Sequence, residues 1–137
     1  MRNFHDVKNT PVASDDDVLA LIRDLVGRAI RRQNWLMFLD SENRPLPLVM
    51  PMDDYPMLPE GDDAPRFAEA IASVMETVDA AQVILTWERP GRPQATPADI
   101  AWARAMATTC RDQGIRVRGQ LISHTEGVRW FAPDDYL

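Results

Sequence analysis

The sequence predicts an α/β fold in which a mixed β-sheet is flanked by helices. Three stretches with apolar residues at helical spacing, within residues 14–33, 65–80 and 97–113, are typical of amphipathic helices. Short continuous apolar runs at 35–39 and 81–86 indicate strands that are buried on both faces. The resulting order α-β-β-α-β-α-β-β indicates a mixed sheet with helices covering it.

The first helix is expected within residues 14–33. Ser14 is a natural N-cap, and three aspartates follow it in the first turn, where the helix dipole favours negative charge. We place Arg28, Arg31 and Arg32 in the last turn of this helix, because basic residues are favoured at a helix C-terminus. Residues 1–13 show no periodicity and are expected to form an N-terminal arm. The apolar face of the helix consists of Val18, Leu21, Ile22, Leu25, Val26, Ala29 and Ile30.

A β-hairpin and a long acidic loop are expected next. The strand at 35–39 is followed by the turn residues Asp-Ser-Glu-Asn at 40–43 and by a returning strand at 46–50. Pro45 and Pro47 push this second strand to an edge of the sheet, because proline cannot donate to the ladder. Residues 51–64 contain prolines, a glycine and five acidic residues, which indicates a loop.

The remaining elements follow from helix capping and apolar runs. Pro65 suits the first turn of a helix that extends to about residue 80, and residues 87–96 form a loop after the strand 81–86. Thr96 and Pro97 mark the start of the next helix, and Gly114 marks its end. Strands are expected at 115–123 and 128–131. The inner face of the 97–113 helix is expected to consist of Ile100, Ala103, Ala107 and Cys110.

Composition places the chain among soluble single-domain proteins, with the domain at 14–137. Of the 137 residues, 45% are apolar and 26% charged. No apolar run approaches the roughly 20 residues of a membrane helix, and the N-terminus lacks the apolar stretch of a signal peptide. A single cysteine cannot form an intramolecular disulfide, so we expect a cytoplasmic protein. The net charge of −6 argues against a nucleic-acid partner.

A motif in the C-terminal half carries a family resemblance. The central strand ends in Trp-Glu-Arg-Pro at 87–90, a Gly/Pro-rich loop follows, and Thr-Pro-Ala-Asp at 96–99 begins the next helix. This pattern resembles the RadC-like JAB domains, whose strand ends in His-x-His-Pro and whose helix begins with Ser-x-x-Asp. The upstream segment 35–44 is similar to the family's strand and its Leu-Asp-x-x-Asn turn, and the likeness covers roughly residues 14–131.

The resemblance implies a three-layer fold of the JAB and cytidine-deaminase type, but not the family's zinc chemistry. The two histidine ligands of the family are replaced here by Trp87 and Arg89, and only Asp99 is retained. Neither an indole nor a guanidinium can bind zinc. The family's general-base glutamate falls at about Arg32 or Gln33. The resemblance therefore implies a degenerate metal site with no catalytic residues, no metal and no cofactor.

Other reactive groups give no stronger candidate. The only histidines are His5 and His124, which are expected at the surface, and Cys110 is expected to be a buried, inert thiol. No phosphate-binding glycine loop and no nucleophile elbow occur.

Two surfaces remain open to a ligand or a partner. Glu88 and Arg92 would lie with Trp87 and Arg89 at the mouth of the degenerate site, where arginines could hold a carboxylate or phosphate. The alternative is that Arg89 pairs with Asp99 and closes the pocket. In the acidic loop, apolar side chains among the acids could form an adaptable partner surface, or they could fold back on the core; these are Met52, Tyr55, Met57 and Leu58.

Three functions are compatible with these observations. The first is a non-catalytic JAB-like module that binds or scaffolds a protein partner or a second copy of itself. The second is an enzyme or ligand-binding domain with a reassigned, metal-free site at Trp87, Glu88, Arg89 and Asp99. The third, suggested only by the family's association with DNA repair, is an accessory factor in that process, and the acidic charge argues against it.

Overall fold

The structure, a computed structural model, describes residues 11–137. In these residues the order α-β-β-α-β-α-β-β is as expected, and a fourth, short helix that was not predicted follows the fifth strand. The elements are α2 (Asp15–Leu25), β1 (Gln33–Leu39), β2 (Pro45–Met52), α3 (Asp63–Val78), β3 (Gln82–Glu88), α4 (Pro97–Asp112), β4 (Val117–His124), β5 (Gly127–Phe131) and α5 (Pro133–Tyr136).

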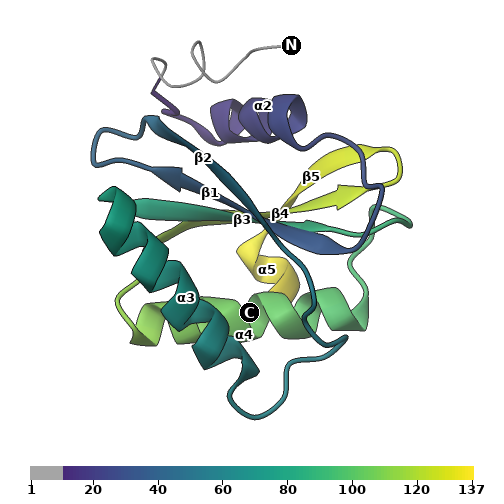
Figure 1. The fold of residues 1–137 in the computed structure, drawn as a ribbon. Helices are drawn as coiled ribbons and strands as arrows, with labels where there is room; N and C mark the ends of the chain where they lie inside the picture. The colour runs from purple at the N-terminus through teal and green to yellow at the C-terminus, as the bar shows by residue number, and fades with distance from the viewer. Residues whose placement is uncertain (1–10) are drawn as a thin grey trace.

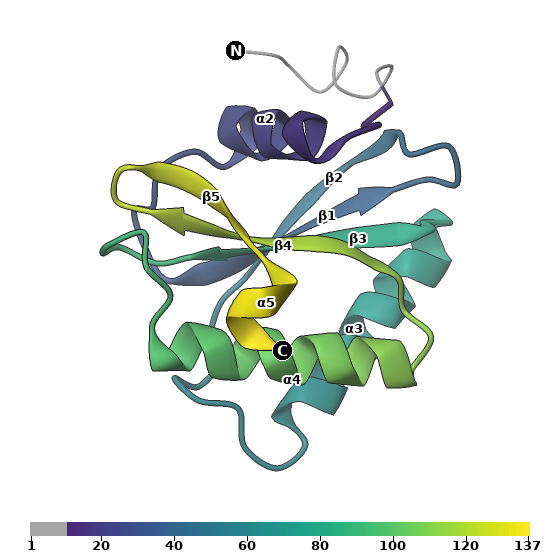
Figure 2. The same cartoon turned by 180° about the vertical axis from the view of Figure 1, so that it is seen from behind.

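The five strands form one mixed sheet with the spatial order β2-β1-β3-β4-β5. β3 pairs with β1 antiparallel and with β4 parallel, and the outer pairs β1–β2 and β4–β5 are antiparallel hairpins. β2 is an edge strand, as its prolines predicted. Figures 1 and 2 show α2 over one face of the sheet, with α3, α4 and α5 over the other. The predicted α/β architecture with a mixed, helix-covered sheet is confirmed.

Two apolar clusters fill the space on either side of the sheet. Leu36 and Phe38 of β1 pack in the cluster beneath α3 and α4, whereas Met37 and Leu39 pack in the cluster beneath α2. Successive side chains of a strand point to opposite faces, so one continuous apolar run supplies both clusters. Among the described residues, no helix combines the length and apolar character needed to cross a membrane.

The first helix is shorter than the sequence predicts. The Ser14 cap and its capping box with Asp17 form as expected, but the helix ends at Leu25. Gly27 adopts the left-handed conformation at φ 70°, which turns the chain away from the helix axis. The prediction that Arg28, Arg31 and Arg32 lie in the last turn is therefore wrong. Ile30, predicted on the apolar face, is 82% exposed.

The buried face of α4 also differs from the prediction. Ala103 and Cys110 are buried as expected, but Ile100 and Ala107 are only partly buried. Trp102 and Met106 take the central positions instead. The prediction favoured the small residues, whereas Trp102 and Met106 pack in the core cluster with residues of α3 and of the sheet.

The described part of the predicted N-terminal arm is attached to the domain. Val12 is buried beneath α2, and its N–H donates to the carbonyl of Asn43 at 2.8 Å. The rest of the arm, including His5, lies outside the described residues.

A close contact between Gly119 and Trp130 joins the last two strands. A Cβ atom built on Gly119 would lie 2.3 Å from Cζ3 and 2.8 Å from Cη2 of the Trp130 ring. The indole therefore occupies the space that any other side chain at 119 would need.

We expect Gly119→Ala to lower the free energy of unfolding by about 1–3 kcal/mol, because the added methyl group displaces the Trp130 ring. In a Trp130→Leu background the same change should cost much less, since the ring is gone. Urea denaturation of the four proteins of this double-mutant cycle measures the coupling. Equal losses in both backgrounds would contradict the packing assignment.

Candidate functional site

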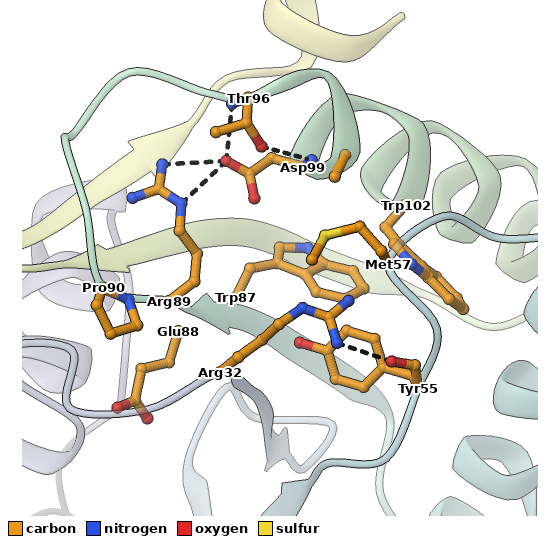
Figure 3. A pocket seen from close by; sticks show the side chains of 11 residues that line it. Arg32, Tyr55, Met57, Trp87, Glu88, Arg89, Pro90, Thr96, Asp99 and Trp102 are labelled. Carbon is orange, nitrogen blue, oxygen red and sulfur yellow. Dashed lines mark hydrogen bonds and ion pairs between the residues drawn. The ribbon is translucent and has the colours of Figure 1, made fainter.

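The end of β3 directs three consecutive side chains to two different sides of the sheet. Trp87 lies directly opposite Asn34 of β1 and beside Ile122 of β4, and packs in the cluster with α3 and α4. Arg89 reaches toward the same side, where α4 begins, while the carboxylate of Glu88 points away from both, as Figure 3 shows. This alternation separates the predicted site residues into two groups.

Arg89 and Asp99 form a largely buried ion pair. Nε and Nη2 of Arg89 donate to Oδ2 of Asp99 at 3.1 and 3.0 Å, and the two side chains are only 12% and 10% exposed. The same guanidinium donates to the carbonyls of Arg92 and Gln94. The expected Arg89–Asp99 pairing is therefore present, and it also holds the loop between β3 and α4 in place.

Asp99 serves the helix as well as the ion pair. Thr96 caps α4 by accepting the Asp99 N–H, and Oδ2 of Asp99 accepts the Thr96 N–H at 2.8 Å. This reciprocal capping box satisfies two backbone donors at the helix start. The capping box between Thr96 and Asp99 thus fixes the position of the carboxylate. Arg89, which lies outside the helix, neutralises its charge.

A cavity of about 290 Å³ remains beside the ion pair. The pairing therefore does not close the pocket. Figure 3 shows side chains from β3, from the start of α4 and from the loops before β1 and after β2 converging around it. The lining residues are Arg32, Tyr55, Met57, Trp87, Glu88, Arg89, Pro90, Thr96, Ala98, Asp99 and Trp102.

Aromatic rings form the deep wall of this cavity. The ring centroids of Tyr55, Trp87 and Trp102 lie between 5.4 and 5.9 Å from one another, and Phe67 contacts all three. Burial raises the pKa of Tyr55 to about 12, against the opposing effect of Arg32, so its phenol stays neutral. Both indole N–H groups are already bonded: Trp87 donates to Gln120, and Trp102 donates to the Pro56 carbonyl.

Arg32 holds the loop after β2 against the aromatic wall. Its guanidinium lies 4.1 Å from the centroid of the Tyr55 ring. Nη1 and Nη2 donate to the carbonyls of Tyr55 and Pro56 at 2.7 and 2.8 Å. Trp102 donates to the same Pro56 carbonyl at 2.9 Å, so donors from the segment before β1 and from α4 together hold this loop beside the cavity.

Glu88 is a structural anion rather than a group aimed at the cavity. Its Oε2 accepts the backbone N–H groups of Ile30 and Arg31, and its Oε1 accepts side-chain N–H groups of Gln33 and Trp35, all within 2.7–3.1 Å. The residue is 2% exposed. Burial acts to raise its pKa, but the four hydrogen bonds outweigh burial and hold the pKa below its ordinary value.

Other predicted site residues are less closely associated with the cavity. Arg92 offers its main-chain carbonyl to Arg89, and its side chain does not line the cavity wall. Met52 and Tyr55 are partly buried against the core, which agrees with the alternative that the apolar side chains of this loop fold back on the core. Met57 and Leu58 are 62% and 48% exposed, so only this part of the predicted partner surface is open.

The reactive residues do not assemble a metal or nucleophile site. Within residues 11–137, no three His, Cys, Asp or Glu side chains gather closely enough to hold a metal ion. Cys110 is fully buried, and burial raises its pKa to about 11. The prediction that His124 lies at the surface is wrong, because it is 7% exposed at the end of β4. Burial, and secondarily Arg89, lowers the pKa of His124.

Sequence reasoning missed Tyr55, Met57 and Trp102 as wall residues of the site. Trp102 lies three positions after Asp99 in α4, so helical spacing could have placed it on the same side as the carboxylate. Nothing in the local sequence of the loop, by contrast, indicates that Tyr55 would fold back onto Trp87.

Comparison with models of known protein families matched none of them, and comparison with curated protein sequences returned no significant relative.

We expect Glu88→Gln to lower the free energy of unfolding by about 2–4 kcal/mol. An amide has only one acceptor oxygen, so two of the four N–H donors would lose their partner and face an NH₂ group. Glu69→Gln, on the exposed side of α3, is the matched control and should change stability by less than about 0.5 kcal/mol. Similar urea midpoints for the two variants would contradict the role of Glu88.

The pH dependence of stability provides a second measurement on Glu88. The pKa of Glu88 is lower in the folded protein than its ordinary value of 4.5. The ionised carboxylate therefore contributes its full share to the free energy of unfolding above pH 4.5. That share is lost as the pH falls from 4.5 through the pKa of the folded protein. We expect wild type to lose up to about 1.4 kcal/mol per pH unit more than Glu88→Gln below pH 4.5. Parallel stability curves for the two proteins between pH 3 and pH 6 would refute this expectation.

Proposed function

We propose that this chain is a non-catalytic JAB-like domain that acts as a binding or scaffolding module. The observation that carries the proposal is the Arg89–Asp99 ion pair beside the cavity. The resemblance assigns the zinc ligands to positions 87, 89 and 99 and the general base to about Arg32 or Gln33. Positions 87, 89 and 99 and, of the last two, Arg32 line this one cavity, which supports the alignment with the JAB domains.

The side chains at these positions do not fit a zinc ion. A catalytic zinc site needs three protein ligands and an open coordination position. Trp87 offers no lone pair, and its indole N–H is bonded to Gln120. Arg89 carries a permanent positive charge and already neutralises Asp99, the one carboxylate that could serve as a ligand. Neither Arg32 nor Gln33, the two candidates for the general-base position, is a carboxylate that could act as a base.

A reassigned enzymatic site has weaker support. General acid–base chemistry needs a titratable group within hydrogen-bond reach of a substrate. Glu88 was the main candidate, but its carboxylate is bonded to four donors and directed away from the cavity. A role as an accessory factor on DNA has no observation in its favour beyond the resemblance, and the net charge of −6 opposes it.

The purified protein is expected to contain no stoichiometric zinc, whereas Trp87→His combined with Arg89→His should gain zinc binding. The double substitution places two imidazoles beside Asp99 and removes the guanidinium that neutralises it, which restores three ligands. Elemental analysis of wild type and calorimetric titration of the variant with zinc are the measurements.

The control adds Asp99→Ala to the double variant and should abolish the gained affinity, while circular dichroism checks that both variants fold. Stoichiometric zinc in wild type would refute the non-catalytic assignment. A folded double variant that binds zinc no better than wild type would refute the alignment with the JAB site.

A further inference from the structure

We propose that the cavity beside Asp99 binds a small, flat, uncharged heteroaromatic molecule with a hydrogen-bond donor on one edge and an acceptor on the opposite edge. The inference rests on the proposed function, because it takes this space to be a binding site rather than a metal centre. Its basis is the combination of aromatic walls with two opposed polar groups.

The size and walls of the cavity favour a flat ring. A volume of about 290 Å³ lies at the lower end of the range for small-molecule sites. Trp87 and Trp102 are 3% and 2% exposed, so only a small part of each indole surface faces the cavity. Because both indole N–H groups are bonded elsewhere, these residues offer ring surface and no donor. Met57, Pro90 and Ala98 add further apolar wall. Such surroundings suit stacking of an aromatic ring.

One oxygen of Asp99 supplies the acceptor at one side of the cavity. Oδ2 accepts from Arg89 and from the Thr96 N–H, whereas Oδ1 accepts no hydrogen bond from residues 11–137. Figure 3 shows Oδ1 directed away from Arg89, toward the side on which Trp87 lies. A ligand N–H placed over the indole would complete the hydrogen bonding of this carboxylate.

Arg32 supplies donors at the opposite side. A guanidinium carries five N–H groups, and Arg32 uses one from Nη1 and one from Nη2 to hold the loop carbonyls. Further N–H groups therefore remain for a ligand oxygen. Figure 3 shows Arg32 and Asp99 on opposite sides of Trp87, so a ring over this indole lies between a donor and an acceptor.

The charges around the cavity disfavour ionic ligands. An organic cation would meet the guanidinium groups of Arg32 and Arg89, and Arg32 already covers the Tyr55 ring that would attract it. An organic anion would meet the Asp99 carboxylate, and Arg89 has committed four N–H bonds to Asp99 and to two loop carbonyls. A neutral molecule with a donor on one edge and an acceptor on the opposite edge can form hydrogen bonds with Asp99 and Arg32 at the same time.

The test is a ¹H–¹⁵N correlation titration that follows the indole N–H signals of the four tryptophans. The probes are 4-quinolone, whose N1–H and C4 carbonyl lie on opposite edges of one ring, N-methyl-4-quinolone, which lacks the donor, and quinoline, which lacks both the N–H and the carbonyl. We expect 4-quinolone to shift the Trp87 and Trp102 signals with saturation. It should bind at least about tenfold tighter than the N-methyl analogue, because a hydrogen bond to a carboxylate is lost in the latter. Trp35 and Trp130 lie on the α2 side and should not shift.

A variant pair tests the location. Ala98→Leu fills the cavity and should weaken 4-quinolone binding at least about tenfold, whereas Ala101→Leu, which adds the same bulk outside the cavity wall, should not. The comparison of analogues needs no variant, so it stands even if Ala98→Leu fails to fold. Equal binding of the three probes, tighter binding of benzyltrimethylammonium or benzoate, or no shift with any probe would overturn the inference. None of these outcomes bears on the zinc measurement, which decides the proposed function separately.

Discussion

The alternation of side chains at the end of β3 is the constraint on which the site depends. Trp87 and Arg89 reach the side of α3 and α4, where they form the wall of the cavity and the ion pair with Asp99. Glu88, between them, can only point to the opposite side, where it binds four N–H donors from residues 30–35. Three consecutive residues therefore connect the strand to the start of α4 on one side and to residues 30–35 on the other. A shift of one residue in the β3 register would exchange these roles and place an anion in the aromatic wall.

The Arg89–Asp99 pair illustrates how a buried charge is tolerated in a small domain. Removing two charges from water is costly, and a buried pair is stable only when further hydrogen bonds satisfy both partners. Here Arg89 also donates to two loop carbonyls, and Asp99 also accepts the N–H of Thr96 at the helix start. The favourable helix dipole at the N-terminus of α4 adds to the stabilisation of the carboxylate. The pair is thus part of a network that fixes the loop 90–96, and loss of either partner would leave a buried charge unpaired.

The sequence predicted features whose causes lie within a few residues and failed where the cause lies far along the chain. The start of α4 and the pairing of Arg89 with Asp99 were predicted because a cap and a short loop determine them locally. The end of α2 was not predicted, because the segment after Gly27 is held by a residue far along the chain. The backbone N–H of Ile30 donates to Glu88, which lies 58 residues later in the sequence. The contribution of Tyr55 to the cavity wall was missed for the same reason. Tyr55 belongs to a loop whose own sequence contains no periodic signal, and hydrogen bonds from Arg31, Arg32 and Trp102 hold this loop against the rest of the domain.

The persistence of the cavity follows from the rigidity of its walls. A void in a protein interior normally shrinks when neighbouring side chains move into it. Here the loop above the cavity cannot descend, because Arg32 and Trp102 hold the Pro56 carbonyl from two directions. The rings of Tyr55, Phe67, Trp87 and Trp102 contact one another, so none of them can rotate into the space without breaking several contacts. On the remaining side, the capping box and Arg89 fix Asp99. A cavity whose walls are held by bonds made elsewhere needs little reorganisation to accept a ligand, which is the property that distinguishes a preformed site from a packing defect.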